Sequence, residues 1–195
     1  MQDFDHDSYV RAEFAAHTAI VEATREAVAE PLRRLVELAA ETIEQGGKIL
    51  FFGNGGSAGD AQHLATELSV RYLQNRPPIA GLALSTDSSA LTAIGNDLGF
   101  EQLFARQVRA LGRRGDLAIG ITTSGKSPNV TLGLEAARNI GIVPAALTGK
   151  GGGDLVGIAD PILIVPSDDT PRIQEMHITI GQIFCGALER RLGLV

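Results

Sequence analysis

The sequence predicts an α/β fold, a three-layer αβα sandwich around a five-stranded parallel sheet with long N- and C-terminal helices. Three observations lead to this prediction. Five short aliphatic or β-branched runs recur along the chain, helical patterns lie between them, and long amphipathic segments flank the whole set. None of the five runs alternates between polar and apolar residues, which is typical of strands buried on both faces of a parallel sheet. Strands and helices that alternate in this way form right-handed βαβ units.

The expected elements follow in chain order. The first is a helical segment over roughly 8–45, in which Pro31 predicts a kink or a split into two helices. The five strands, each ending near Gly, Ser, Thr or Pro, are KILFFG (48–53), IAGLALST (79–86), LAIGITTS (117–124), IVPAALTG (142–149) and PILIVPS (161–167). The helices between and after them are expected at 57–71, 88–95 with 101–111, 128–140, 153–158 and about 171–191.

Composition and charge exclude several classes of protein. Hydrophobic residues at 44% and charged residues at 21% are ordinary for a globular protein, and no apolar run approaches the ~20 residues that span a bilayer. A net charge of −6 argues against a nucleic-acid-binding surface. The N-terminal MQDFDHDSYV lacks the pattern of a signal peptide, and the lone Cys185 rules out a disulfide framework within the chain. We therefore expect one cytoplasmic domain over 1–195, with neither membrane nor nucleic acid as a partner.

The loop after the third expected strand contains GITTSGKS (120–127), which fits the nucleotide-binding expression G-x-x-x-x-G-K-[ST]. Gly120, however, falls inside the apolar run, and Pro128 follows the loop at once, where it suits the first turn of a helix. Too few residues remain for a triphosphate cradle. Four hydroxyl residues stand where this strand turns into a helix, namely Thr122, Thr123, Ser124 and Ser127. A plain helix cap needs only one of them, so the sequence favours a site for a single, sugar-borne phosphate.

The loop after the first expected strand, GNGGSAGD (53–60), also has the composition of a ligand-binding loop. Its glycines permit positive φ angles and a close approach of the backbone to a ligand. Asn54 and Ser57 add polar groups where the next helix begins. As a dinucleotide fingerprint the loop is weak, since no acidic residue follows at the required distance.

Two helices carry polar residues that could act on a ligand. His63 and Glu67 are four residues apart, so they lie on one helix face with Cβ atoms ~5–6 Å apart. They form either a metal-binding pair or an ordinary exposed pair. The last helix carries Gln174, Glu175, His177 and Gln182 among apolar residues. These side chains form either a buried hydrogen-bond network or a further wall of the same site.

Five segments together resemble the phosphoheptose isomerase family, the sedoheptulose 7-phosphate isomerase branch of the sugar isomerase (SIS) domain superfamily. They are GNGGSAGDAQHLATEL, LTAIGND, TTSGKSPN, LTGKGGGD and RIQEMH, and the match runs over nearly the whole chain, in the family's order and spacing. The resemblance implies a flavodoxin-like SIS domain and conversion of sedoheptulose 7-phosphate to D-glycero-D-manno-heptose 7-phosphate, for lipopolysaccharide or another heptose-containing glycan. It also implies a homotetramer with active sites between subunits, in which the helical segment 1–46 packs on the core and takes part in subunit contacts.

The resemblance further implies roles for individual residues. Those implied to hold the phosphate are Ser57, Thr122, Thr123, Ser124 and Ser127. Those implied to hold the sugar or to line its site are Asn54, Gly55, Gly56, Glu67, Asn96, Asp97 and Gln174. The implied ligands of one Zn²⁺ per subunit are His63, Glu67, Gln174 and Gln182. The implied catalytic positions are Glu67 and Gln182, since isomerisation through an enediol needs a base near C1 and C2 and stabilisation of the oxyanion.

One position departs from the family. Eight residues after Gln174 the family carries a histidine that binds zinc and acts as an acid/base, and this chain has Gln182. A glutamine oxygen can bind a metal, but an imidazole suits Zn²⁺ better, and a neutral amide cannot shuttle a proton. The chain is therefore either an isomerase with a weaker metal site and one acid/base, or a non-catalytic phosphosugar-binding or replication-initiator-associating protein of the same superfamily.

Overall fold

The computed structural model describes residues 4–195, so the first three residues of the expected N-terminal segment 1–46 lie outside the described residues. The strands are β1 (Ile49–Gly53), β2 (Gly81–Ala83), β3 (Leu117–Thr122), β4 (Val143–Thr148) and β5 (Ile162–Ile164). The α-helices are α1 (His6–Glu44), α2 (Gly56–Ser69), α3 (Ser88–Asp97), α4 (Leu103–Leu111), α5 (Pro128–Asn139) and α6 (Thr170–Arg191). Two 3₁₀ turns, η1 (Phe100–Gln102) and η2 (Lys150–Leu155), complete the set.

The strands form one parallel sheet in the order β2-β1-β3-β4-β5, which confirms the predicted fold class. β2 and β5 are shorter than expected, with three residues each. The strand order reverses between β1 and β3. In open α/β sheets, this switch point is where loops diverge and leave a crevice for ligands beyond the carboxyl ends of the strands.

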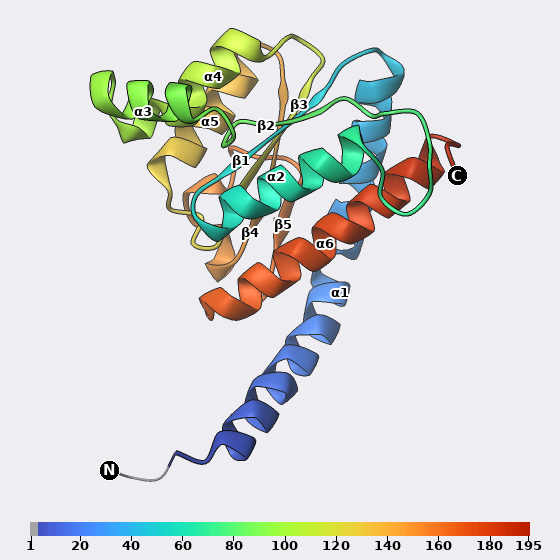
Figure 1. Ribbon diagram of the computed structural model, residues 1–195, viewed down its shortest axis with the longest axis vertical. Helices are drawn as coiled ribbons and strands as arrows, with labels where there is room; N and C mark the ends of the chain where they lie inside the picture. The colour runs from blue at the N-terminus through green and yellow to red at the C-terminus, as the bar shows by residue number, and fades with distance from the viewer. Residues whose placement is uncertain (1–3) are drawn as a thin grey trace.

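Side chains of each central strand alternate between two apolar layers. Ile49 and Phe51 of β1 face the layer formed with α1, α2 and α6, whereas Leu50 and Phe52 face the layer formed with α3, α4 and α5. Figure 1 shows these two groups of helices on either side of the sheet. Both faces are covered, which explains why the strand sequences read as continuous apolar runs.

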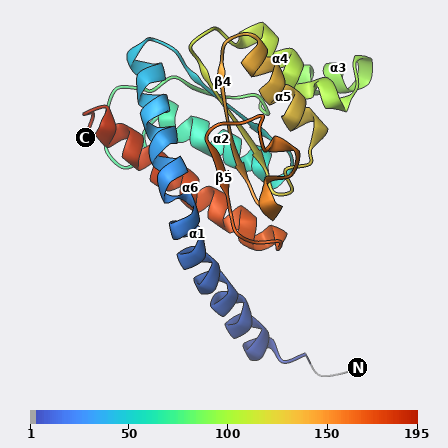
Figure 2. The ribbon, with the colours of Figure 1, turned by 180° about the vertical axis from the view of Figure 1, so that it is seen from behind.

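Helix α1 is continuous through Pro31, so the expectation of two separate helices is wrong. Its buried side chains run from Thr24 to Thr42, and they pack on the core on both sides of Pro31. Tertiary packing of this kind outweighs one lost backbone hydrogen bond. The first half of α1 projects beyond the body of the molecule, and its second half crosses α6 (Figure 1, Figure 2).

The helix expected at 153–158 is also wrong, because the chain forms the 3₁₀ turn η2 at Lys150–Leu155 instead. Three successive glycines, Gly151 to Gly153, have φ angles of 71°, 92° and 54°, which an α-helix cannot contain. This turn packs against the loop after β3, where the Asp154 N–H donates to the Gly125 carbonyl at 2.9 Å. The glycine-rich turn η2 thus packs against the loop after β3, which carries the hydroxyl residues. No helix among residues 4–195 combines the length and the hydropathy that a membrane crossing requires.

Candidate functional site

Two loops flank the switch point, one after β1 and one after β3. Their side chains are tied together by Asn54 and Asn129, whose amides exchange two hydrogen bonds of 2.8 and 2.9 Å. A pocket of about 360 Å³ opens beside this amide pair and is lined by Asn54, Phe100, Glu101, Lys126, Ser127, Pro128 and Asn129. The structure therefore brings two predicted residues, Asn54 and Ser127, to one pocket at the carboxyl edge of the sheet.

Gly120 lies within β3 and is paired with Phe52 and Ala146 of the neighbouring strands. A Cβ atom at Gly120 would lie 2.9 Å from Cγ1 of Val130, so this glycine allows α5 to pack closely on the sheet. Only residues 123–127 remain between β3 and α5. The segment GITTSGKS therefore does not form a nucleotide-binding P-loop, in agreement with the prediction.

The predicted hydroxyl cluster converges at the start of α5. The hydroxyl oxygens of Thr122 and Ser127 are 3.0 Å apart, and Oγ of Ser124 accepts the Lys126 N–H at 3.1 Å. Ser127 occupies the N-cap position of α5, yet its side chain makes no capping hydrogen bond. Thr123 lies half-buried in the same loop. The hydroxyls and the first turn of α5 thus retain hydrogen-bonding capacity for an anion.

The start of α2 is the second such terminus. Its N-cap, Gly55, has a φ of 56° and offers no side chain, and Ser57 is buried in the first turn. The amide of Gln174 on α6 lies directly over Gly56, where any Cβ atom would collide with it. Four predicted residues are therefore gathered at this turn, beside the loop that carries Asn54.

Helices α2 and α6 run side by side in the same direction, as Figure 1 shows. Two turns after Gly56 on α2, His63 Nε2 lies 3.3 Å from Oε1 of Glu67 and contacts the amide of Gln182 on α6. The side chain of His63 is 46% exposed and that of Glu67 is 18% exposed, so a ligand can reach both. The structure thus unites three members of the predicted ligand set, while Gln174 lies nearer the start of α2.

Two predicted site residues, Asn96 and Asp97, and the lone cysteine lie elsewhere. Asn96 and Asp97 end α3 on the exposed surface, where the Asn96 amide donates to Asp97 at 2.6 Å. Among the side-chain hydrogen bonds of residues 4–195, neither Asn96 nor Asp97 is bonded to a predicted site residue outside this pair. Cys185 is a buried free thiol, as the sequence suggests, and its pKa is raised to about 12, first by burial and then by the carboxylates of Glu67 and Glu189.

Sequence reasoning missed Asp60 and Asn129. Asp60 lies one turn before His63, and its pKa is raised by burial, against the opposing effect of His63. Asn129 is 2% exposed, although it follows Pro128 in the first turn of a helix, where an exposed polar residue is ordinary. The spacing of three residues between Asp60 and His63 could have revealed Asp60, but no local sequence pattern reveals Asn129.

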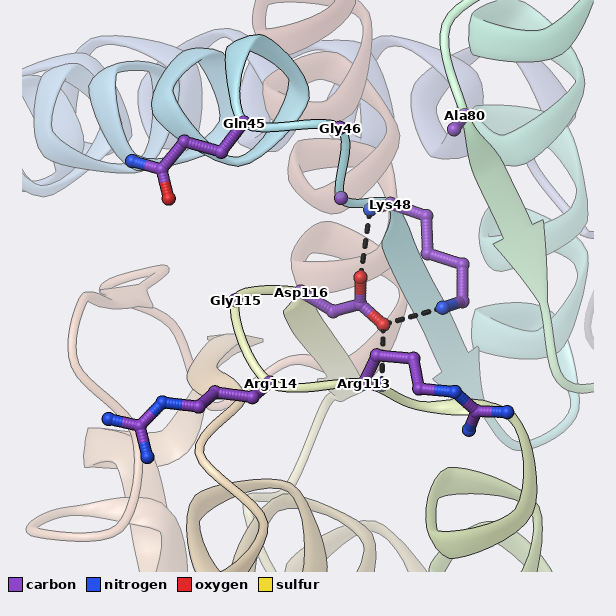
Figure 3. Close-up of a pocket in the computed structure, with 9 residues that line it drawn as sticks. Gln45, Gly46, Lys48, Ala80, Arg113, Arg114, Gly115 and Asp116 are labelled. Carbon is purple, nitrogen blue, oxygen red and sulfur yellow. Dashed lines mark hydrogen bonds and ion pairs between the residues drawn. The ribbon is translucent and has the colours of Figure 1, made fainter.

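A second hollow, of about 320 Å³, lies at the amino ends of β1 and β3 (Figure 3). At its centre the carboxylate of Asp116 accepts the Lys48 N–H at 2.9 Å, the Arg113 N–H at 2.8 Å and the Lys48 ammonium group at 2.6 Å. Both carboxylate oxygens are used, and Asp116 is only 2% exposed. This cluster joins strand ends and leaves no carboxylate oxygen without a partner.

Comparisons with known proteins bear on the family to which the chain belongs. The family model for the SIS domain matches residues 14–149. A phosphoheptose isomerase from Paramagnetospirillum magneticum is 55% identical over 182 residues, which is 93% of this chain and 95% of that protein. Phosphoheptose isomerase GmhA from Neisseria gonorrhoeae superposes with a TM-score of 0.89 at 41% identity, over 94% of this chain and 98% of that one. A phosphoheptose isomerase from Francisella tularensis gives a TM-score of 0.92 at 34% identity, over 96% of this chain and 100% of the other.

Proposed function

The chain belongs to the SIS domain family and, within it, to the phosphoheptose isomerases, and we propose that it converts sedoheptulose 7-phosphate to D-glycero-D-manno-heptose 7-phosphate at the carboxyl edge of its sheet. It is an aldose–ketose isomerase that acts on heptose phosphates. Heptose made in this way supplies lipopolysaccharide or another heptose-containing glycan. The non-catalytic alternatives, a phosphosugar-binding or replication-initiator-associating protein, are not favoured, because the relatives that are 55% and 50% identical over 93% and 94% of the chain are phosphoheptose isomerases.

One observation supports the mechanism: a single helix, α2, carries both Ser57, proposed to bind the phosphate, and Glu67, proposed as the base. Ser57 lies in its first turn, and Glu67 lies ten residues later, which is about 15 Å along the helix axis. The contact with His63 shows that the Glu67 carboxylate is turned back toward the start of the helix. A seven-carbon sugar phosphate can therefore span from the hydroxyl loops to Glu67.

The phosphate would be held by the hydroxyls of Ser57, Thr122, Ser124 and Ser127, with Thr123 beside them. The first turns of α2 and α5 add N–H groups and the positive ends of two helix dipoles. Anchoring the phosphate fixes the position of the carbon chain, which makes proton transfer at the other end efficient. Asn54 and Gln174 lie beside the first turn of α2, where their amides can bind sugar hydroxyls together with the backbone of Gly55 and Gly56. Asn96 and Asp97 would reach the sugar from the exposed end of α3.

Glu67 is the base in this mechanism. Its carboxylate removes a proton from one of the carbons C1 and C2 and returns it to the other, through an enediol. His63 contacts the same carboxylate and orients it. Gln182 cannot exchange protons, but its amide N–H groups can donate to the oxyanion that develops on the sugar. The acid/base work therefore rests on Glu67, and Gln182 acts as a hydrogen-bond donor.

We also propose one Zn²⁺ per subunit, held by His63 and Glu67 together with the amide oxygens of Gln182 and Gln174. The imidazole and the carboxylate suit zinc, whereas amide oxygens are weaker ligands for it, so the donor set fits a metal of reduced affinity. A bound zinc ion would polarise the carbonyl and hydroxyl oxygens of the sugar. Replacing Gln182 with His should tighten zinc binding in an equilibrium titration. An unchanged titration would count against the placement of Gln182 at the metal.

A homotetramer is supported by the apolar side chains left on the outside of α1 and α6. Phe14 and Ile183 are 71% and 52% exposed, and a groove of about 320 Å³ with almost wholly apolar walls runs between the two helices. Exposed apolar surface of this extent marks an interface, and we propose that further copies of the chain cover it, with active sites between subunits. We place the enzyme in the cytoplasm, because charged sugar phosphates do not cross membranes unaided.

The direct test is turnover of sedoheptulose 7-phosphate by the purified protein, with and without added Zn²⁺. We expect the aldose product in both conditions, with faster turnover when zinc is present. A protein that binds the sugar phosphate but forms no product in either condition would defeat the isomerase proposal and favour the binding module. The oligomeric state can be measured by light scattering in the same samples.

A further inference from the structure

Helix α2 ends soon after Glu67, and its last carbonyl groups need partners from outside the helix. The last turn of α2 contains no basic residue that could supply them. Arg76, in the loop that leads to β2, takes this role. Its Nη2 donates to the main-chain carbonyl of Glu67 at 2.7 Å, and its Nη1 donates to that of Leu68 at 2.7 Å. One guanidinium group therefore holds the backbone at the residue that bears the reacting carboxylate.

Arg76 is itself held by a second buried charge. Its Nε donates to Oε1 of Glu189 on α6 at 2.7 Å, and the side chains of Arg76 and Glu189 are 0% and 1% exposed. The same carboxylate oxygen accepts the Tyr72 N–H at 3.3 Å. A fully buried ion pair is expensive to desolvate and often adds little to stability compared with an apolar pair of the same size. The cost of burying this pair indicates that it has a role other than stability.

The position of the pair indicates what that role is. Arg76 and Glu189 join the end of α2 that carries Glu67 to the helix that carries Gln182. The planar guanidinium donates in several fixed directions at once, which a lysine cannot do. The distance and angle between the Glu67 carboxylate and the neighbouring helix are thus fixed through the main chain. The phosphate loops, at the opposite end of α2, are held separately by the Asn54 and Asn129 amides.

We propose that Arg76, held by Glu189, is a positioning residue for catalysis, which fixes Glu67 against the C1–C2 edge of the substrate through the main-chain carbonyl of Glu67. This inference rests on Glu67 being the base of the proposed reaction. Loss of the Arg76–Glu189 pair should therefore lower kcat and leave KM nearly unchanged, because the phosphate would be bound more than two helical turns away.

The first test is Arg76→Lys, which keeps the positive charge opposite Glu189 but cannot bridge both carbonyl groups and the carboxylate. We expect KM for sedoheptulose 7-phosphate to stay within about twofold and kcat to fall roughly 10- to 100-fold, the scale of loss expected from a small misplacement of a reacting group. The control is Arg191→Met on α6, the helix that carries Glu189; it removes an exposed arginine paired with Glu37 and Glu44 and should leave both constants unchanged. A wild-type kcat in Arg76→Lys would overturn the proposal.

The second test is the double variant Arg76→Met with Glu189→Met, which replaces the ion pair with apolar side chains and leaves no buried charge unpaired. We expect its thermal midpoint to stay close to that of the wild type, while kcat remains as low as in Arg76→Lys. If kcat returns to the wild-type value together with the thermal midpoint, the pair is only structural. Glu67→Gln is measured beside these variants. Should Glu67→Gln retain turnover, the assignment of the base is wrong, and that result is distinct from a failure of the Arg76 inference.

Discussion

The two ends of the sheet use polar side chains in opposite ways. At the amino ends, both oxygens of Asp116 are occupied by Lys48 and by the Arg113 backbone, and the cluster is closed on itself (Figure 3). At the carboxyl ends, Ser127 caps α5 without making a capping bond, and α2 begins at a glycine. Saturated polar groups join strands, whereas groups with spare hydrogen-bonding capacity are available to a ligand.

The N-caps of α3 and α5, two helices in one layer of the fold, differ in the same way. Helix α3 begins at Asp87, whose carboxylate accepts the Ala90 N–H at 3.0 Å. Helix α5, which belongs to the same layer but starts at the switch point, has no such side-chain bond at Ser127. A filled cap stabilises its helix by about 1 kcal/mol. Leaving the cap open at α5 gives up this stability, and the Ser127 hydroxyl is not used by the first turn of its own helix.

The largest effect that this comparison predicts is on catalysis at the carboxyl edge. Glu67→Gln should lower kcat by about 10²- to 10⁴-fold, because the base that moves the proton is lost. Stability should change little, since the amide is isosteric and the side chain is partly exposed. Steady-state kinetics and thermal unfolding of the same preparation separate the two effects. Loss of the fold instead of loss of turnover would show that Glu67 belongs with Asp116 as a structural residue.

A substitution at the amino edge should have the opposite effect, lowering stability and leaving substrate binding unchanged. Asp116→Ala should destabilise the protein by about 3 kcal/mol, because it leaves the Lys48 ammonium group and two partly buried N–H groups without their acceptor. Denaturant unfolding measures this loss. At a temperature where the variant is folded, KM for the sugar phosphate should match that of the wild type. A raised KM with unchanged stability would mean that the hollow in Figure 3 takes part in substrate binding.

Much of this contrast was visible in the sequence. The five apolar runs predicted the sheet, because strands covered on both faces need no polar positions. The loops at the carboxyl edge were visible because glycines and hydroxyls cluster there within a few residues. Of the two outcomes predicted at Pro31, a kink or a split, the split was wrong, because packing of the second half of α1 preserves one continuous helix.

The partners within the site were beyond the reach of sequence patterns. Asn54 and Asn129 are 75 residues apart, and Arg76 and Glu189 are 113 residues apart. Neither pair has a characteristic spacing, since each depends on how loops and helices meet in the folded chain. Asp116 was missed for the same reason, because its acceptor role requires β1 and β3 to be neighbours.

A buried histidine beneath the carboxyl edge, His177, can be compared with Asp116 by measuring stability as a function of pH. His177 is fully buried, its ring nitrogens lack side-chain partners among the described residues, and burial lowers its pKa to about 4. In the unfolded chain its pKa is near 6.5, so above that pH both states are neutral and pH has no effect through this group. Between pH 6.5 and pH 4 only the unfolded state binds the proton, and stability falls by about 3 kcal/mol.

The matched variant for this prediction is His177→Leu, which cannot take up the proton. Free energies of unfolding measured at pH 7 and pH 4 should fall by about 3 kcal/mol less in the variant than in the wild type. The difference between the two proteins cancels the contribution of the carboxylates, which titrate in both. Equal losses would show that the His177 ring finds a proton acceptor when it becomes charged.

The smallest expected effect concerns one hydroxyl of the open cap. Ser127→Ala removes the contact with Thr122 at 3.0 Å and a hydroxyl that we propose binds the phosphate. A hydrogen bond to a charged group contributes about 1.5–3 kcal/mol, so KM should rise roughly tenfold or more while kcat changes little. Stability should stay nearly unchanged, because the wild-type hydroxyl makes no capping bond. Its counterpart Asp87→Ala should do the reverse, with a loss of about 1 kcal/mol in stability and an unchanged KM. If both variants lose stability and neither changes KM, the open cap of α5 is an ordinary helix start and the phosphate binds elsewhere.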